Sequence, residues 1–333
     1  MISFNTLVKK CLLPRSASLA VALALGLGLS GAHAAAPATA ALFPEPVYVT
    51  LQASNAVEIL PSGRICTGLP SAHYIAVTPD GKLLLVSSAN LPEAYLVNAQ
   101  TCQKLATFDV GPITQGATIS PNGRWGLVVS AKDGTVAVID LKTRKLVKSI
   151  AVGNTPHNIV FTGDGVFAYV TLQGGAGVAV IDMRALTKVR GFATIDLPHN
   201  LDFSPDGKTI WIRDFVGHVV AVNAATGKQL AEIPVGPSHA GIDVLSNGKY
   251  AFTGAIGGHD VDVIVPRTFK AIKHIDVGQG PHGVRSSRNG RWVYAAVTGT
   301  NEVAVIDTRT LEVVKQIPLD GKFPFWIAVA GKN

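Results

Sequence analysis

Histidines recur in this chain at one kind of position, close behind a proline, about once every forty residues. They occur in TPHN (155–158), LPHN (197–200), GPSHAG (236–241) and GPHG (280–283). Imidazole is the commonest metal ligand in proteins, and it suits copper, zinc and iron. If the fold gathers these side chains at one concave surface, the pattern predicts a site for a transition metal, a haem or an anionic small molecule.

A regular period in the sequence determines where these histidines lie. Asp-Gly and Asn-Gly pairs return every 41 or 42 residues, each between two apolar runs rich in β-branched residues. The pairs are Asp80-Gly81, Asn122-Gly123, Asp164-Gly165, Asp206-Gly207, Asn247-Gly248 and Asn289-Gly290. Because these dipeptides tolerate the positive φ angles of tight turns, each pair predicts a β-hairpin.

Two more runs follow each hairpin, so every unit holds four short antiparallel strands. Examples of the third run are TVAVIDL (135–141) and EVAVIDT (302–308), and KLVKSIAVG (145–153) is a fourth run. The aspartate of each VID segment closes a strand before a turn, where its side chain can accept hydrogen bonds from nearby backbone. Four strands at a period of 40–45 residues are typical of a β-propeller.

Six complete repeats span roughly 71–324, and the two ends of the chain supply a seventh. The segment 324–333 matches 198–207 in length and pattern, and 47–70 supplies three more strands. We therefore predict an all-β, seven-bladed β-propeller of four-stranded antiparallel blades. One blade combines N- and C-terminal strands and closes the ring, which removes exposed sheet edges. The propeller is expected to form a single domain over 46–333.

The first 34 residues have the pattern of a secretory signal peptide. Three basic residues precede the apolar run ASLAVALALGLGL (17–29), and AHA (32–34) fits a cleavage site near Ala34. We expect a flexible linker over 35–45, a periplasmic location and no membrane anchor after cleavage. Cleavage removes three basic and no acidic residues, which lowers the formal net charge from +7 to +4. The remaining basic residues are scattered, so no nucleic-acid partner is expected, and a closed propeller is expected to be a monomer.

The repeat units resemble a known propeller family. VYVT (47–50), AYVT (168–171), the PDGK turns (79–82 and 205–208) and the VAVID strands are similar to the YVTN-type repeat of YncE-like periplasmic proteins. The resemblance covers essentially everything after residue 45 and implies the propeller fold. More distantly, it extends to the propeller domains of cytochrome-type nitrite reductases, which carry haem, and of nitrous oxide reductases, which hold copper. Fold alone does not determine function.

The alternation of strand direction places every proline–histidine segment at the start of an innermost strand. These segments should surround the mouth of the central channel, on the face that we call the top. The residues that lie seven positions before each turn Asp or Asn form a column around that mouth, one residue per blade. The column reads His73, Gln115, His157, His199, Ala240 and His282, with Phe325 at the equivalent place in the closing blade. A one-residue bulge would bring His239 into the column in place of Ala240.

Two interpretations of this ring are open. Copying of a repeat would place polar residues there without any function. Alternatively, the ring binds a metal or a haem-like cofactor, with His157, His199 and His282 as the expected metal ligands. Arg213 and Asp214 on a top-face loop could help to hold a carboxylate or phosphate. No C-x-x-C-H motif is present, so a haem would not be attached covalently.

Two functions therefore follow from the sequence as hypotheses. One is a non-catalytic binding or scaffold protein that recognises a protein or small-molecule ligand through its top face. The other is a protein that binds copper, zinc or a haem-like cofactor through the histidines. A lyase or lactonase is a weaker third, because no paired acid and base can be identified, and no common catalytic motif is present. An oxidising compartment would allow a Cys66–Cys102 disulfide, and two free thiols are the alternative.

Overall fold

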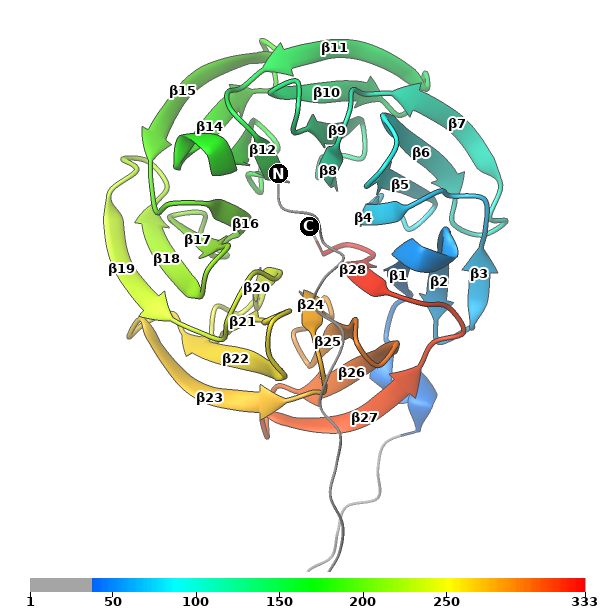
Figure 1. Ribbon diagram of the computed structural model, residues 1–333, viewed down its shortest axis with the longest axis vertical. Helices are drawn as coiled ribbons and strands as arrows, with labels where there is room; N and C mark the ends of the chain where they lie inside the picture. The colour runs from blue at the N-terminus through cyan, green and yellow to red at the C-terminus, as the bar shows by residue number, and fades with distance from the viewer. Residues whose placement is uncertain (1–37, 333) are drawn as a thin grey trace, which may run out of the picture. The chain divides into compact units, whose positions relative to one another are not determined.

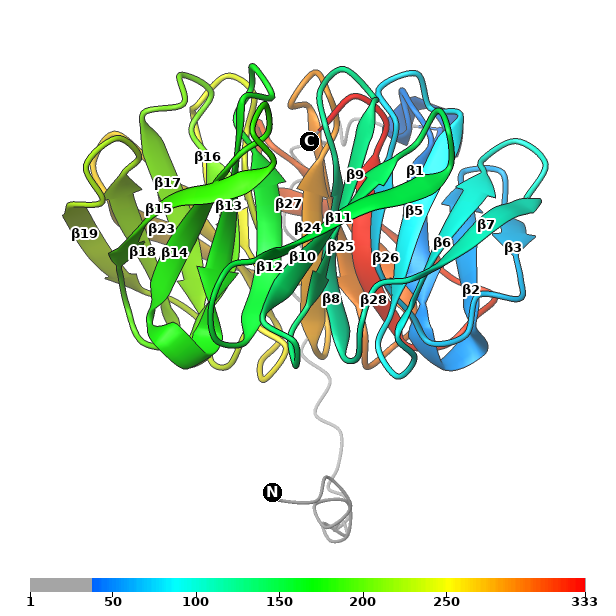
Figure 2. The same ribbon diagram turned by 90° about the horizontal axis from the view of Figure 1, so that it is seen from above.

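A computed structural model describes residues 38–332, which form seven four-stranded antiparallel sheets arranged as a β-propeller (Figure 1). The predicted fold class and blade number are confirmed. The predicted signal peptide (1–34) lies outside the described residues. Among the residues described, no helix is long and apolar enough to span a membrane. Figure 2 shows the ring from its edge, with the strands running between its two faces.

We number the blades in chain order from the first complete one. Blade 1 contains β4 (Ala72–Val77), β5 (Leu83–Ser88), β6 (Glu93–Asn98) and β7 (Lys104–Asp109). Blade 2 contains β8 (Thr114–Ile119), β9 (Trp125–Ser130), β10 (Thr135–Asp140) and β11 (Lys145–Ala151). Blade 3 contains β12 (Pro156–Phe161), β13 (Phe167–Leu172), β14 (Gly177–Asp182) and β15 (Thr187–Ala193). The first strand of each blade is the innermost.

Blades 4 to 6 repeat this order. Blade 4 contains β16 (Pro198–Phe203), β17 (Thr209–Asp214), β18 (His218–Asn223) and β19 (Gln229–Pro234). Blade 5 contains β20 (Ile242–Val244), β21 (Ala251–Thr253), β22 (Asp260–Val265) and β23 (Lys270–Asp276). Blade 6 contains β24 (Pro281–Ser286), β25 (Trp292–Val297), β26 (Glu302–Asp307) and β27 (Glu312–Pro318). Three short 3-10 helices are η1 (Thr39–Leu42), η2 (Gln52–Ser54) and η3 (Gln173–Gly175).

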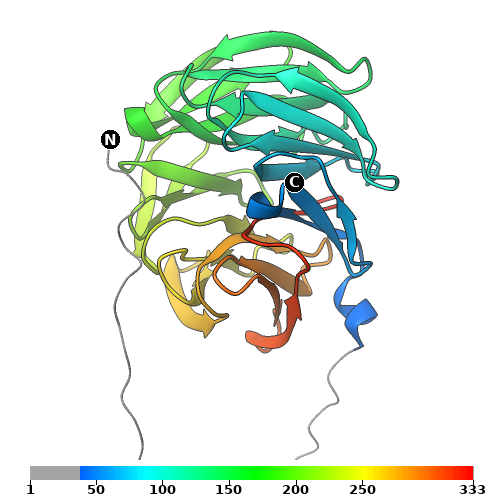
Figure 3. The same ribbon diagram turned by 45° about the vertical axis from the view of Figure 1, so that its right-hand side comes forward.

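Blade 7 closes the ring as predicted, with one strand from the C-terminal end of the fold. Its order is β28 (Pro324–Val329), β1 (Val47–Leu51), β2 (Ala56–Leu60) and β3 (Arg64–Cys66). β28 pairs antiparallel with β1, with Val47 opposite Val329 (Figure 1 and Figure 3). This pairing completes a four-stranded sheet in the seventh blade and closes the ring.

The Asp-Gly and Asn-Gly pairs form the hairpin turns on the face opposite the top. In blade 1 the amide of Gly81 donates to the carbonyl of Thr78 at 2.8 Å, and Gly81 has a φ of 72°. The side chain of Asp80 accepts a hydrogen bond from the amide of Lys82 at 3.1 Å. The glycine supplies the left-handed conformation and the aspartate stabilises the turn, which explains why the pair recurs.

Two further sets of contacts stabilise the ring. We expected a flexible linker over 35–45. In the part of this segment that the structure describes, η1 and the residues after it pack against blade 6 instead. Phe43 stacks on Tyr294 with 5.3 Å between ring centroids, and the Tyr294 hydroxyl donates to the Leu42 carbonyl at 2.7 Å. A disulfide joins Cys66 of blade 7 to Cys102, which lies in the turn before β7 of blade 1.

Candidate functional site

The chain reaches each innermost strand through a residue in the left-handed conformation. This residue lies two positions before the histidine column in all seven blades, with φ between 48 and 76°. The seven residues are Ser71, Ile113, Thr155, Leu197, Ser238, Gly280 and Phe323. Only one of them is glycine, and the β-branched side chains of Ile113 and Thr155 are rarely found in this region. The top face thus carries a ring of unusual backbone, which the repeat pattern did not reveal.

A β-bulge then turns the column side chains toward the channel. Ala72 pairs with Ser88 and Ile75 with Val86, so His73 and Tyr74 together oppose a single residue of β5. The same register shift occurs between the first two strands of blades 2, 3, 4 and 6 and between β28 and β1. Bulges redirect side chains and are frequent at functional sites.

Blade 5 departs from this rule. Its innermost strand β20 begins only at Ile242, so residues 238–241 lie outside the strand in place of the expected one-residue bulge. His239 nevertheless joins the column histidines, because its ring centroid lies 4.4 Å from that of His199 and 5.2 Å from that of His282. Ala240 is buried.

The structure therefore brings all five expected histidines together at the top of the channel. Their rings form a continuous arc with Phe325. The centroid distances along it are 3.7 Å for His157–His199, 4.4 Å for His199–His239, 5.2 Å for His239–His282, 3.7 Å for His282–Phe325 and 4.2 Å for Phe325–His73. Gln115 continues the circle, with its Oε1 3.0 Å from Nε2 of His73. The rings fill the top of the channel instead of lining an open mouth, and all but His239 are buried.

The ring nitrogens differ in their hydrogen bonding. Both nitrogens of His73 lie 3.0 Å from side-chain amide groups, those of Gln52 and Gln115. Nδ1 of His282 donates to the carbonyl of Phe325 at 3.0 Å, and Nδ1 of His199 lies 2.8 Å from the amide of Gln173. Nε2 of His199 and Nε2 of His282 are buried without any hydrogen-bond partner. An unpartnered polar atom at this depth is unfavourable and calls for an explanation.

Three of the histidines lie close enough together to hold a metal ion. His199, His239 and His282 each offer a ring nitrogen, and these atoms lie within 4.8 Å of one another. This set differs from the expected one, since His239 stands in place of His157. Nδ1 of His157 is instead 3.3 Å from the His199 carbonyl. We call His199, His239 and His282 the histidine triad.

Burial keeps these imidazoles neutral at ordinary pH. It lowers the pKa of His73 to about 4, and burial together with the charge of Arg213 lowers the pKa of His239 to about 4. Burial also holds the pKa values of His157, His199 and His282 well below the usual range, and the neighbouring histidines add to the effect. Neutral imidazole is the form that binds metals.

Below the histidines, a second layer of side chains closes the channel. Tyr74, Asn158, Asn200 and Trp326 each follow a column residue in the bulge, and all are buried. The Tyr74 ring lies 4.4 Å from the Trp326 ring. Access to the histidines is therefore from the top face.

Arg213 and Asp214 do not point at an open mouth. Arg213 is completely buried, and its guanidinium donates to the carbonyls of Gly236 at 2.6 Å and Ser238 at 2.5 Å. Asp214 accepts hydrogen bonds from Arg213 at 3.1 Å and from the His218 amide at 2.7 Å. The pair connects blade 4 to the segment immediately before His239, so it positions a triad member.

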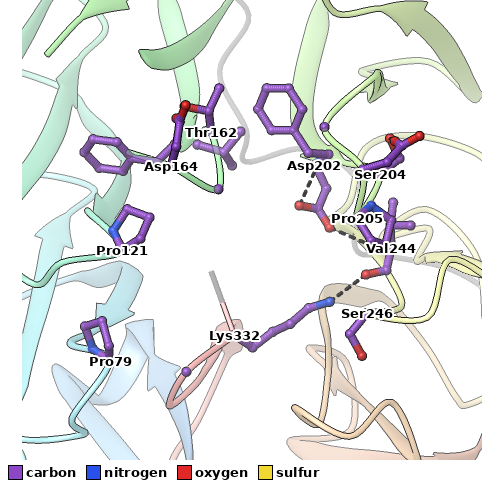
Figure 4. A pocket seen from close by; sticks show the side chains of 17 residues that line it. Pro79, Pro121, Thr162, Asp164, Asp202, Ser204, Pro205, Val244, Ser246 and Lys332 are labelled. Atoms are coloured by element: carbon purple, nitrogen blue, oxygen red, sulfur yellow. Dashed lines mark hydrogen bonds between the residues drawn. The ribbon is translucent and has the colours of Figure 1, made fainter. Parts of the chain in front are cut away.

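A cavity of about 690 Å³ lies on the opposite face, among the hairpin turns (Figure 4). Lys332 reaches across it and donates to the carbonyl of Val244 at 2.6 Å, while the Val244 amide donates to Asp202 at 2.8 Å. Burial raises the pKa of Asp202 to about 6.

Sequence reasoning missed the charged residues of the lower channel. Asp202, Asp243 and Arg285 lie on innermost strands of blades 4, 5 and 6, and Arg285 Nη1 is 3.5 Å from Asp243 Oδ1. A detectable signal was present for Asp202 and Asp243, since each is a single charged residue in a short run that is otherwise largely apolar.

Comparisons with known proteins show the fold. No family model and no curated protein matches this chain. Among solved structures, the chain is similar to hydrazine synthase of Kuenenia stuttgartiensis, with a TM-score of 0.70, 22% identity and coverage of 80% of this chain and 91% of that one. It is also similar to the dihydro-heme d1 dehydrogenase NirN in complex with DHE, with a TM-score of 0.64, 17% identity and coverage of 86% and 75%.

A third similar structure is that of a functionally unknown protein from Desulfotomaculum acetoxidans. The TM-score is 0.73 at 14% identity, with coverage of 87% of this chain and 100% of that one. At these identities the likeness extends to the β-propeller architecture.

Proposed function

We propose that this chain is an exported YVTN-type, YncE-like β-propeller that binds a transition-metal ion at the histidine triad. Export to the periplasm is supported by the signal-peptide pattern of 1–34 and by the Cys66–Cys102 disulfide, which suits an oxidising compartment. The family assignment is supported by the YVT segments, which fall in β1 and β13. The protein is proposed to act as a monomer.

One observation carries the metal site: the two triad nitrogens that have no partner. Leaving a buried polar atom unpaired costs about 1–3 kcal/mol. Nε2 of His199 and Nε2 of His282 are both in this state, and one ring nitrogen of each of His199, His239 and His282 lies within 4.8 Å of the other two. A metal bound by the three histidines through these nitrogens would give the unpartnered atoms a ligand bond. Repeat copying explains why histidines recur, but it does not explain two unpaired nitrogens in one cluster.

The test is metal analysis of the mature protein, purified from periplasm without chelators. We expect close to one equivalent of a first-row transition metal, lost in the His199→Ala/His282→Ala double variant. His259→Ala is the matched control, since His259 is an exposed histidine of blade 5. Metal far below one equivalent, together with no uptake on titration, would contradict the proposal.

A second function, recognition of a ligand or protein partner at the top face, is favoured by the apolar residues exposed there. Leu197 is 44% and Phe323 is 39% exposed, although both occupy left-handed positions where glycine would be unstrained. Phe215, 41% exposed, stacks on His239 with 4.3 Å between centroids. A haem-type ligand at this face would contact His239 and these side chains, and the structurally similar NirN was solved with DHE.

The two functions separate experimentally. Leu197→Ser and Phe323→Ser leave the histidine triad intact. We expect both to weaken binding of a haem-type ligand or crosslinking to a protein partner while the metal content is unchanged. A Soret absorption band in the purified protein would identify the haem-type ligand directly.

A further inference from the structure

We infer that the cavity among the hairpin turns binds a linear aliphatic amine with two or more ammonium groups, and that the side chain of Lys332 occupies its innermost position. This site is separate from the histidine triad, because the buried layer that contains Tyr74 and Trp326 lies between them. Metal binding at the triad is therefore not required for it.

Lys332 differs in kind from the residues at the equivalent position of the other blades. Seven residues after the column position lies an Asp or Asn of a hairpin turn in each of the six complete repeats, but Lys332 in blade 7. Blade 7 has no hairpin at this point, because β28 and β1 come from opposite ends of the fold. Instead, Gly331 adopts a φ of 74° and the Lys332 amide donates to the Val329 carbonyl at 3.1 Å. The lysine side chain then extends across the cavity (Figure 4).

The ammonium group of Lys332 is held by buried acceptors. Its Nζ donates to the carbonyl of Val244 at 2.6 Å and lies 3.5 Å from Oδ1 of Asp243. The side chains of Lys332 and Asp243 are only 10% and 0% exposed. We call the Val244 carbonyl and the Asp243 carboxylate the ammonium site. Because every primary ammonium group carries the same three donors, a ligand amine that reaches this site can make the contacts that Lys332 makes.

The charges around the ammonium site balance only while a cation occupies it. Asp202 and Asp243 are buried carboxylates, and Nη1 of Arg285 lies 3.5 Å from Asp243. Burial raises the pKa of Asp202 to about 6, and Lys332 is the cation that most opposes this rise. At neutral pH these four side chains carry two negative and two positive charges. Withdrawal of Lys332 would leave an uncompensated buried negative charge, which the ammonium group of a ligand can neutralise.

The rest of the cavity also favours a cation. Its volume of about 690 Å³ lies within the range of small-molecule sites. Among the described residues that line it, the charged side chains other than Lys332 are carboxylates, those of Asp164, Asp202 and Asp206. Hydrogen bonds from Thr162 and Ser204 lower the pKa values of the exposed Asp164 and Asp206, so both are ionised. We call Asp164 and Asp206 the outer carboxylates.

The combination of the two regions indicates the chemical class of the ligand. One ammonium group would lie in the ammonium site, and a second would pair with the outer carboxylates. The carboxylates exclude an anionic ligand by repulsion. Apolar side chains also line the cavity, among them Val160, Pro121 and Pro205, and an aliphatic chain between the ammonium groups can pack on them. A linear diamine or triamine has these properties.

The experiment measures binding of spermidine, a linear triamine, to the mature protein and to Lys332→Met by isothermal titration calorimetry. Lys332 competes for the ammonium site, so the apparent affinity of the wild type is reduced by the fraction of molecules in which the lysine is withdrawn. We expect Lys332→Met to bind one equivalent of spermidine at least about tenfold more tightly than the wild type. The metal content should be the same in both proteins.

Lys208→Met is the matched control. Lys208 is an exposed lysine on the hairpin turn of blade 4 and does not line the cavity, so this variant should bind spermidine as the wild type does. Lys332→Gln repeats the test if Lys332→Met does not fold, since its neutral amide can still donate to the Val244 carbonyl. Equal affinities of the wild type and the Lys332 variants, or no binding to any of them, would overturn the inference.

Asp164→Asn and Asp206→Asn test the outer carboxylates. Asparagine already occupies this turn position in three other blades, at Asn122, Asn247 and Asn289. In the Lys332→Met background, each substitution should weaken spermidine binding by about threefold and leave binding of butylamine, which has one ammonium group, unchanged. Asp80→Asn is the control, since Asp80 lies on the turn of blade 1 and does not line the cavity. Unchanged spermidine binding in both variants would overturn the requirement for a second ammonium group.

A lysine side chain of a partner protein is the other possible source of an ammonium group. A blocked Gly-Lys-Gly peptide tests it on Lys332→Met. We expect this peptide to bind more weakly than spermidine, because it offers a single ammonium group. Tighter binding of the peptide would overturn the assignment to a small amine and would favour a protein segment as the ligand.

Discussion

The hydroxyl of Tyr74 donates a hydrogen bond across the central channel to the side-chain oxygen of Asn200, 3.0 Å away. Tyr74 lies in blade 1 and Asn200 in blade 4, so the bond joins non-neighbouring blades. Asn200 in turn donates to the carbonyl of Ala240 in blade 5 at 2.7 Å. This chain of contacts forms the floor beneath the histidine triad and limits how far the blades can separate.

Removing the Tyr74 hydroxyl should destabilise the ring without opening a cavity. Tyr74→Phe leaves the buried oxygen of Asn200 without this donor, which should lower the free energy of unfolding by about 1–3 kcal/mol. Urea unfolding measures the change. Tyr250→Phe, at a partly exposed tyrosine of blade 5, should change stability by less than about 0.5 kcal/mol. Similar effects of the two substitutions would contradict a structural role for the cross-channel bond.

Arg213 should be essential to the fold around His239. Arg213→Ala leaves Asp214 and two backbone carbonyls of residues 236–238 without their buried partner, so we expect a loss of about 3–5 kcal/mol in stability. Arg213→Lys retains the charge but lacks the planar fork, so it should recover only part of the loss. Urea unfolding of the two variants tests this. Full stability of Arg213→Ala would show that the guanidinium is not a link between blades.

Acidification below pH 6.5 should destabilise the protein through its buried histidines, while Asp202, whose pKa burial raises to about 6, acts in the opposite direction. Burial lowers the pKa of His73 to about 4 from an ordinary value of 6.5, so the unfolded chain takes up this proton first as the pH falls. The stability that the neutral histidines contribute is therefore complete above pH 6.5. The free energy of unfolding falls as the pH drops toward 4, by about 1.4 kcal/mol per pH unit for each such histidine. His157, His199, His239 and His282 shift in the same direction.

Urea unfolding of the metal-free protein at pH 7, 6 and 5 measures this slope. His73→Gln removes one titrating group and should reduce it. A stability that is constant over this range would mean that the native histidines accept protons as readily as those of the unfolded chain.

Loss of the disulfide should weaken ring closure. Cys66 and Cys102 are 36 residues apart and connect blade 7 to blade 1. A cross-link that closes a loop of this length lowers the entropy of the unfolded chain and so stabilises the fold by about 3–4 kcal/mol. Cys66→Ser/Cys102→Ser should therefore unfold at a lower urea concentration than the oxidised wild type, and reduced wild type should match the variant. A variant as stable as the oxidised protein would contradict this expectation.

Local signals made the fold predictable from the sequence. A pair such as Asp80-Gly81 needs only its own backbone and neighbouring side chains to form a turn, so its 41- to 42-residue recurrence identified the hairpins without any knowledge of distant contacts. The closing blade could be predicted by counting repeats. Six complete repeats leave one strand at the C-terminal end of the fold and three at the N-terminal end, and these must pair to close the ring. The segment around Phe43 gave no such signal, since its order comes from Tyr294, about 250 residues away.

The column of histidines was likewise determined by the sequence, because its distance from each hairpin turn is constant. The membership of the triad was decided by the tertiary structure. His239 joins His199 and His282 because residues 238–241 leave the regular strand and Arg213 of another blade holds the segment. Whether Nε2 of His199 and Nε2 of His282 have a hydrogen-bond partner likewise depends on side chains from several blades. Hairpins arise from interactions close in sequence, whereas the site arises where seven separate strands converge, and only the closed ring sets those distances.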